Sequence, residues 1–146
     1  VWNREDAEDV VQDSMALAEE RRAQLDGEDR WWGWVQKIVI NRCHTWGRSQ
    51  GRRQRHQRVL AHSRAEPTEP GADARTLAKA RTDWLREALR QLPARKREVI
   101  VLRHLENQSY EQISAVLGIS ASTARVHARD GLESLRSALP GPAVGD

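Results

Sequence analysis

The sequence predicts an all-α protein made of two small helical domains joined by a flexible linker, and three observations support this. Apolar residues recur at helical spacing in the longer segments, and no alternating β-strand pattern occurs. The stretch 61–75 contains two prolines, one glycine and little that is large and apolar. Near the carboxyl end, "GIS" joins two helical patterns into a helix-turn-helix. We therefore predict domains at 1–60 and 76–146, with the linker at 61–75.

The first domain is predicted to hold an acidic helix followed by a longer basic one. Asn3 is placed to cap the first helix, 3–20, and acidic residues fill its first turn, where the helix dipole favours them. After a turn at 25–30, the second helix runs from about 29 to 55 and is weakened locally by Gly33. The residues expected to face inward from these helices are Ala7, Val10, Val11, Ser14, Met15, Ala18, Trp31, Trp34, Val35, Ile38 and Val39.

The second domain is predicted to contain four helices, at 76–91, 94–105, 109–117 and 121–139. Pro93 is expected at the first position of the second of these. Ser109 and Gln112 have the spacing of a capping box, Gly118 suits a left-handed helix end, and Ser120 is placed to cap the last helix. The residues expected to face inward include Leu77, Trp84, Leu85, Ala88, Leu89, Val99, Ile100 and Leu102.

Charge is strongly segregated along this chain of 146 residues with a net charge of +3. Residues 1–29 carry three basic and ten acidic side chains, whereas residues 30–65 carry nine basic and no acidic ones. This pattern predicts a basic partner for the first segment and a polyanion for the second. The alternative is that the two segments neutralise each other inside one fold, or that each is a solvated, solubilising helix face.

Composition argues against membrane spans and against enzymes. No run of about 18 apolar residues and no signal peptide is visible, and the single cysteine, Cys43, cannot form an internal disulfide, so a cytoplasmic protein is expected. The five histidines are scattered and no glycine-rich phosphate loop occurs, so we expect no catalytic residues, no metal and no cofactor. A remote alternative is a recombinase-like DNA-processing enzyme whose acidic residues in 1–29 would hold Mg²⁺.

The last helix has the pattern of a DNA recognition helix. Its apolar residues share one face, and its first turn is small and polar. Hydroxyl groups and arginines suit base edges and phosphates, and small residues allow close approach to a major groove. The residues on or beside the polar face are Ser122, Thr123, Arg125, Val126 and Arg129. The alternative is a well-capped surface helix of an ordinary three-helix bundle.

Several stretches resemble a known family when they are taken in order. "LRQLPARKREVIVLRHLENQSYEQISAVLGISASTARVHARDGLESLR" resembles the fourth domain of bacterial sigma factors, and best the extracytoplasmic-function (ECF) group of the sigma-70 family. "DAEDVVQDS" and "WVQKIVINRC" resemble two consecutive helices of the second domain of that family. The resemblance implies a promoter-recognition subunit that binds core RNA polymerase and directs transcription initiation, with an anti-sigma factor as a further partner. A stand-alone helix-turn-helix regulator that binds DNA without polymerase is the alternative.

The resemblance also implies three sites. It places Gln12 and Asp13 at the polymerase clamp, and an acidic surface that includes Asp9 suits a basic protein better than DNA. It places the second helix near minus-ten DNA, where the contact residues would be Trp34, Lys37, Asn41, Arg48, Arg52 and Arg53. It places Ser122, Thr123, Arg125, Val126 and Arg129 against minus-35 DNA. Trp31, Trp32 and Trp34 could stack on an unpaired base, or could belong to the core.

Three departures from the family pattern are visible. The chain begins almost at the "DAEDVVQ" motif, so a sigma factor truncated at its amino end is expected. Asp130 stands where family members often have arginine or another non-acidic residue, and we expect it to project outward and repel phosphate. Gln36 and Ile40 replace more usual polar or aromatic residues on the helix expected to face DNA.

Overall fold

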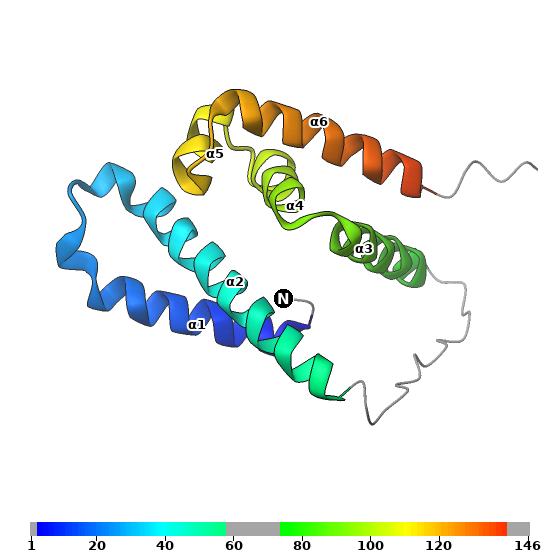
Figure 1. Cartoon of the computed structure of the whole chain (residues 1–146), viewed down its shortest axis with the longest axis horizontal. Coiled ribbons are helices and arrows are strands. Elements are labelled where there is room, and N and C mark those ends of the chain that lie inside the picture. Colours follow the sequence, from blue (N-terminus) through cyan, green and yellow to red (C-terminus); the bar gives the residue numbers. More distant parts are fainter. Residues whose placement is uncertain (1–2, 58–73, 140–146) are drawn as a thin grey trace, which may run out of the picture. The chain divides into compact units, whose positions relative to one another are not determined.

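The computed structural model describes residues 3–57 and 74–139, and every regular element within these ranges is helical. The chain divides into two compact units, residues 1–68 and 69–146. Figure 1 shows the helices of each unit. Of the segment predicted as a linker, only residues 74 and 75 are described, and they form the first turn of a helix. The rest of that segment lies outside the described residues.

The first unit is a pair of helices packed along each other, α1 (Arg4–Glu20) and α2 (Trp31–Gln57). Asn3 caps α1 as predicted, because its Oδ1 accepts a hydrogen bond of 2.7 Å from the backbone N–H of Asp6. Two short 3-10 turns, η1 (Arg22–Gln24) and η2 (Glu28–Arg30), connect the helices. The second helix therefore begins at Trp31, two residues later than predicted.

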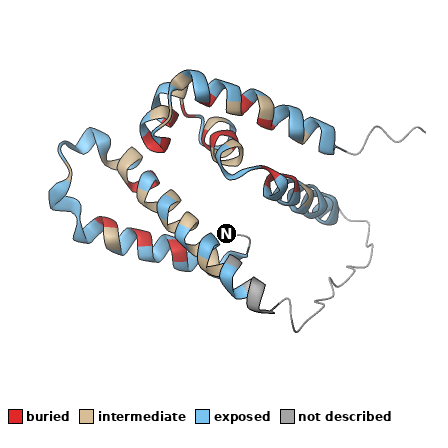
Figure 2. Ribbon diagram, in the orientation of Figure 1, coloured by how far each residue is buried: buried red, intermediate tan, exposed pale blue. Residues whose placement is uncertain are grey.

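A narrow strip of small residues forms the contact face of α1. Val10, Ser14 and Ala18 are buried, and the Ser14 hydroxyl donates a hydrogen bond of 2.6 Å to the Val10 carbonyl, so its polar group is satisfied. The prediction was wrong for Val11 and Met15, which are about half exposed. In Figure 2, α1 is mostly pale blue and carries only short red bands. One neighbouring helix covers only a strip, whereas the sequence pattern marks a wider apolar face.

The second unit is built from four helical segments around one core. They are α3 (Ala74–Gln91), α4 (Ala94–Ile100) with its π-helical continuation η3 (Val101–Leu105), α5 (Tyr110–Leu117) and α6 (Ala121–Ala138). Leu89, Leu92 and Ile100 form a buried cluster against which Leu135 packs. A Cβ at Gly131 would lie 2.9 Å from Cγ1 of Ile100, so the absence of a side chain there lets α6 approach α4 closely.

Most of α3 is exposed, which differs from the prediction. Ala88 and Leu89 are buried near its carboxyl end, but Leu77 is 57% and Leu85 37% exposed. The prediction was therefore wrong for Leu77 and Leu85, because the structure buries only the last turns of the apolar face of α3.

The ends of the helices in the second unit follow the predicted capping signals, with one exception. Ser109 and Gln112 form the predicted capping box, and Gly118 ends α5 in the left-handed conformation with φ of 67°. Ser120 caps α6, accepting a hydrogen bond of 3.0 Å from the backbone N–H of Thr123. Pro93 is the N-cap of α4 and not its first helical residue, because its ψ of 143° is not helical, although its carbonyl accepts the 3.0 Å hydrogen bond from the Arg97 N–H.

Candidate nucleic-acid interface

Helices α5 and α6 form a helix-turn-helix whose turn is tightly held. The hydroxyl of Ser114 donates a hydrogen bond of 2.5 Å to the carbonyl of Ile119 within the turn. Ile113 of α5 and Ala124 of α6 are fully buried, and Ala128 is almost so. Because the inner faces of the two helices are fixed in this way, the outer face of α6 is a rigid surface.

All five residues predicted to face minus-35 DNA are exposed. They belong to the first three turns of α6, and they are Ser122, Thr123, Arg125, Val126 and Arg129. Val126, an apolar side chain, is 43% exposed among these polar neighbours. An exposed helix face with hydroxyls, guanidinium groups and one small apolar side chain can contact phosphates, base edges and a thymine methyl group.

Both arginines of this face have partners within the protein. Arg125 Nη2 lies 3.4 Å from a carboxylate oxygen of Glu111 in α5, and the Arg125 guanidinium carbon lies 5.1 Å from the ring centroid of Tyr110. Arg129 Nη2 lies 3.1 Å from Oδ1 of the adjacent Asp130. Nothing in the sequence indicated that Tyr110 and Glu111 would contact Arg125. Both residues stand in the first turn of α5.

The prediction for Asp130 was wrong in its geometry. Its side chain is only 37% exposed, and its Oδ2 lies 3.9 Å from Nζ of Lys96 in α4. Asp130 is therefore directed toward Lys96 of α4 and Arg129, and it does not project freely outward. Its single negative charge is shared between these two cations, because both Lys96 and Arg129 are within ion-pair distance.

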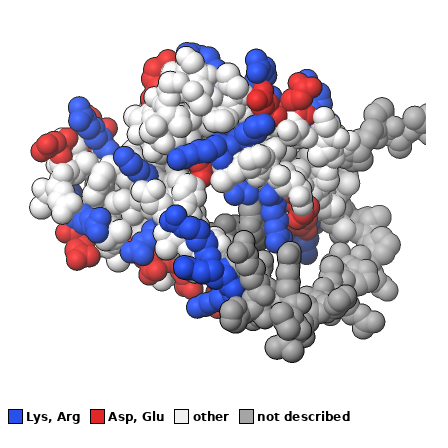
Figure 3. All heavy atoms as spheres, viewed as in Figure 1, with Lys and Arg blue, Asp and Glu red and all other residues white. Residues whose placement is uncertain are grey.

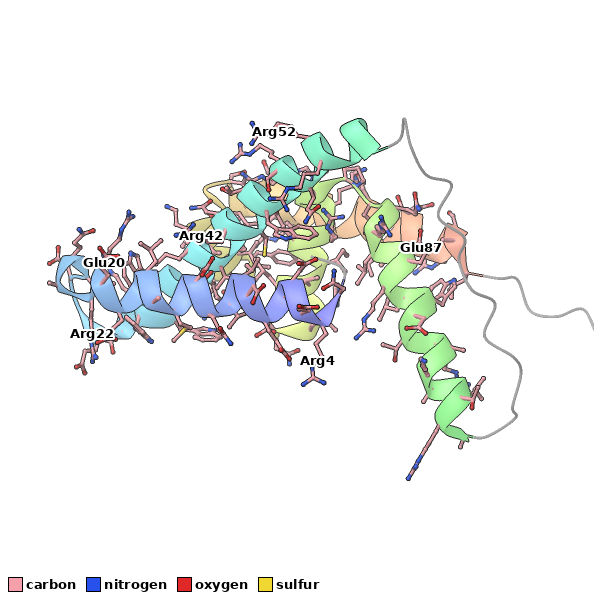
Figure 4. The ribbon with its side chains drawn as sticks, turned by 90° about the horizontal axis from the view of Figure 1, so that it is seen from below. Arg4, Glu20, Arg22, Arg42, Arg52 and Glu87 are labelled. Atoms are coloured by element: carbon pink, nitrogen blue, oxygen red, sulfur yellow. The ribbon has the colours of Figure 1, made fainter. Side chains whose placement is uncertain are left out.

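A basic stripe runs along α2 in the first unit. The predicted minus-ten residues Lys37, Asn41, Arg48 and Arg52 are exposed, and at 100° per residue they fall within about 60° of one another around the helix. Arg53 is also exposed but lies about 100° further round. Figure 3 shows blue side chains along the part of the first unit formed by α2, and Figure 4 shows Arg52 pointing away from α1.

Trp31, at the start of α2, borders an open hollow of about 660 Å³ that sequence reasoning missed. Its lining residues are Arg22, Leu25, Gly27, Glu28 and Trp31. The Arg22 guanidinium carbon lies 5.6 Å from the Trp31 ring centroid, and the rings of Trp31 and Trp34 are also 5.6 Å apart. Trp34 is half-buried and Trp32 is 60% exposed. Gln36 and Ile40, which depart from the family pattern, face inward, since Gln36 is buried and Ile40 is half-buried.

The predicted polymerase-binding residues lie on the exposed side of α1. Asp9, Gln12 and Asp13 are all exposed, and Asp9 and Asp13 are one turn apart. Glu8 is engaged in an ion pair of 2.6 Å with Arg4. Within residues 3–57 and 74–139, no three acidic, histidine or cysteine side chains are arranged to hold a metal ion. In the same ranges, no helix is both long and apolar enough to cross a membrane.

Comparisons with known proteins place this architecture in a family. The profile of "Sigma-70, region 4" matches residues 82–135, which run from within α3 into α6. The RNA polymerase sigma factor CarQ of Myxococcus xanthus is 32% identical over 133 residues, covering 91% of this chain and 74% of CarQ. The chain belongs to the ECF group of the sigma-70 family.

Two relatives named as ECF sigma factors support this assignment. The ECF RNA polymerase sigma-E factors of Haemophilus influenzae and Escherichia coli K12 are 29% and 30% identical, and the chain spans 69% and 66% of their lengths. The sigma factor RpoE of Bartonella quintana, solved with the anti-sigma factor NepR, superimposes with a TM-score of 0.72 at 22% identity. That match covers 94% of this chain and 83% of RpoE, and it confirms the predicted all-α fold. This ECF sigma factor is a promoter-recognition protein of transcription initiation.

Proposed function

We propose that this ECF sigma factor divides promoter recognition and polymerase binding between its two units. Helix α6 reads the minus-35 duplex, the basic stripe of α2 contacts minus-ten DNA, and the acidic side of α1 binds core RNA polymerase. The observation that carries the proposal is the rigid helix-turn-helix whose five predicted DNA-facing residues are all exposed on one element.

The surface of α6 fits a major groove in shape and in chemistry. Its first turn carries Ser122 and Thr123, which let a groove wall approach closely, and the free N–H groups of a helix start attract phosphate. Arg125 and Arg129 are one turn apart, so they can reach neighbouring positions along the groove. These features support reading of a duplex sequence.

The start of α2 suits a single strand better than a duplex. Trp31 and Arg22 line an open hollow, and Trp32, the residue after Trp31, is exposed. Aromatic side chains stack on unpaired bases, while a basic stripe such as Lys37, Arg48 and Arg52 follows the phosphates. We propose that this part of the first unit holds an opened minus-ten strand.

The acidic side of α1 requires a different partner. Asp9 and Asp13 are exposed and would repel DNA phosphates, so a basic protein surface complements them. Core RNA polymerase is the proposed partner, and we therefore propose that the protein acts in the cytoplasm. Because the solved relative RpoE was captured with an anti-sigma factor, an anti-sigma factor is proposed as a second partner. We propose no enzymatic activity and no cofactor.

The test is capture of purified core RNA polymerase by the full chain, followed by transcription from a library of bacterial promoter fragments. We expect a stable complex and initiation at a subset of promoters. A stand-alone helix-turn-helix regulator would bind duplex DNA while leaving polymerase in the unbound fraction, and that outcome would overturn the proposal. Magnesium-dependent cleavage of plasmid DNA would instead indicate the recombinase-like alternative.

A further inference from the structure

We propose that Tyr110 is a positioning residue for Arg125 and that Arg125, held in this way, contacts a base edge in the minus-35 element. The inference rests on the proposed role of α6 and concerns how Arg125 is held. Tyr110 belongs to α5 and Arg125 to α6, so the contact crosses the helix-turn-helix.

Tyr110 is held at its backbone and contacted at its ring. It is the first residue of α5, directly after Ser109, and the backbone there is held by the two hydrogen bonds of the capping box, 2.8 and 3.1 Å long. At the ring, the Arg103 guanidinium carbon lies 4.6 Å from the centroid. Arg103 is held in turn, because its Nη1 donates a hydrogen bond of 2.8 Å to the Gln108 carbonyl.

Arg125 completes this cluster from α6. Its guanidinium carbon lies 5.1 Å from the Tyr110 centroid, within the distance at which a cation is attracted to an aromatic ring. Glu111, the next residue of α5, places a carboxylate oxygen 3.4 Å from Arg125 Nη2. The ring thus supports the guanidinium, and the carboxylate restrains its orientation. The side chain of Arg125 nevertheless remains 54% exposed and accessible to a ligand.

The arrangement has a consequence for recognition. A free arginine side chain must lose the freedom of several rotatable bonds when it forms a bidentate contact with a guanine. Contact with Tyr110 and Glu111 restricts that freedom before DNA arrives, and preorganisation of this kind favours affinity for the matching base. Arg129 is more exposed, at 74%, and its carboxylate partner is its own neighbour Asp130, so the effect should be specific to Arg125.

The first measurement is made on the full chain without DNA. Arginine side chains are labelled for NMR, and the Arg125 Nε–H signal is identified by its loss in Arg125→Lys. We expect this signal to be displaced by the ring current of Tyr110, to return to the free-arginine position in Tyr110→Leu, and to stay displaced in Tyr110→Phe, which keeps the ring. An identical signal in the wild-type chain and in Tyr110→Leu would overturn the positioning role.

The second measurement uses a duplex pool of randomised sequence, captured by the full chain and sequenced. The base position read by Arg125 is the one whose preference disappears in Arg125→Ala. At that position we expect Tyr110→Leu to weaken the preference about two- to fivefold and Tyr110→Phe to retain it. In the Arg125→Ala background, Tyr110→Leu should have no further effect on base preference.

These outcomes distinguish a failure of the proposed role of Tyr110 from a failure of the proposed function. If Arg125→Ala abolishes a preference that Tyr110→Leu leaves intact, the positioning role fails while the proposed function stands. If Arg125→Ala changes no preference, Arg125 does not read a base and the proposed positioning for base recognition fails, while Arg129 and the other exposed residues of α6 still test the proposed function. A merely structural role for Tyr110 would lower the midpoint of thermal unfolding without changing base preference, and that result would also overturn the proposal.

Discussion

At the scale of single residues, each arginine of the α6 face has an acidic partner. Arg125 is 3.4 Å from Glu111, and Arg129 is 3.1 Å from Asp130. Exposed ion pairs of this kind contribute only about 0–1 kcal/mol to stability. Each carboxylate also competes with phosphate for the same guanidinium, so we expect the pairs to weaken the contacts of these arginines with phosphate.

The two arginines are expected to differ when each is replaced by alanine. Arg125→Ala should cost roughly 1–3 kcal/mol of binding free energy and relax specificity at one base position, since a bidentate base contact is lost. Arg129→Ala should weaken binding to all sequences alike and lower the slope of log affinity against log salt concentration by about one. The measurement is duplex affinity of the full chain over a salt series. Unchanged affinity and slope in both variants would show that α6 does not contact DNA.

Replacement of Asp130 by asparagine should have the opposite effect. Asp130→Asn removes the carboxylate from Arg129 and Lys96 while keeping the shape of the side chain. Affinity for duplex DNA should rise and the salt slope should steepen by about one. Glu133→Gln is the matched control, because it removes the same charge at an exposed position of α6. If both variants change affinity equally, only the net charge of the unit matters.

At the scale of elements, the helix ends illustrate what local sequence can predict. The capping box at Ser109, the left-handed Gly118 and the cap at Ser120 depend on short-range chemistry, so all three were predicted correctly. The π-helical turn Val101–Leu105 and the contacts of Tyr110 with Arg103 and Arg125 depend on residues brought together by packing. Residue spacing alone carries no signal for such contacts.

Gly118 offers a test of the turn between α5 and α6. Its φ of 67° disfavours any residue with a Cβ, although a Cβ there would meet no other atom within 4 Å. Gly118→Ala should therefore destabilise the second unit by about 1 kcal/mol through backbone strain alone, and Gly118→Asn should cost less. Gly47→Ala, at an equally open position inside α2, should stabilise by up to about 1 kcal/mol. Urea unfolding followed by circular dichroism measures the free energy of unfolding of both variants. A change of the same sign in Gly118→Ala and Gly47→Ala would contradict the expectation.

At the scale of the whole molecule, the segregation of charge along the sequence survives in the fold. Asp9, Gln12 and Asp13 of α1 and the basic stripe of α2 are exposed, which favours separate partners over mutual neutralisation. The sequence could predict these surfaces because charge and helical spacing are local properties. It could not predict how much apolar surface stays uncovered, as at Met15 and Leu77, because periodicity defines a face and only packing determines what covers it.

Two double variants of the full chain should each lose one activity, polymerase binding or duplex binding, and keep the other. Gln12→Ala with Asp13→Arg places a positive charge on the acidic side of α1, and repulsion from a basic surface should weaken core-polymerase binding more than tenfold. Its affinity for duplex DNA should stay equal or rise slightly, because the net charge increases by two. Arg125→Ala with Arg129→Ala should lose duplex affinity and still capture polymerase through α1. Capture of polymerase at wild-type strength by the α1 variant would show that Gln12 and Asp13 are a solvated helix face, and loss of both activities in either variant would show that the two units do not divide the work.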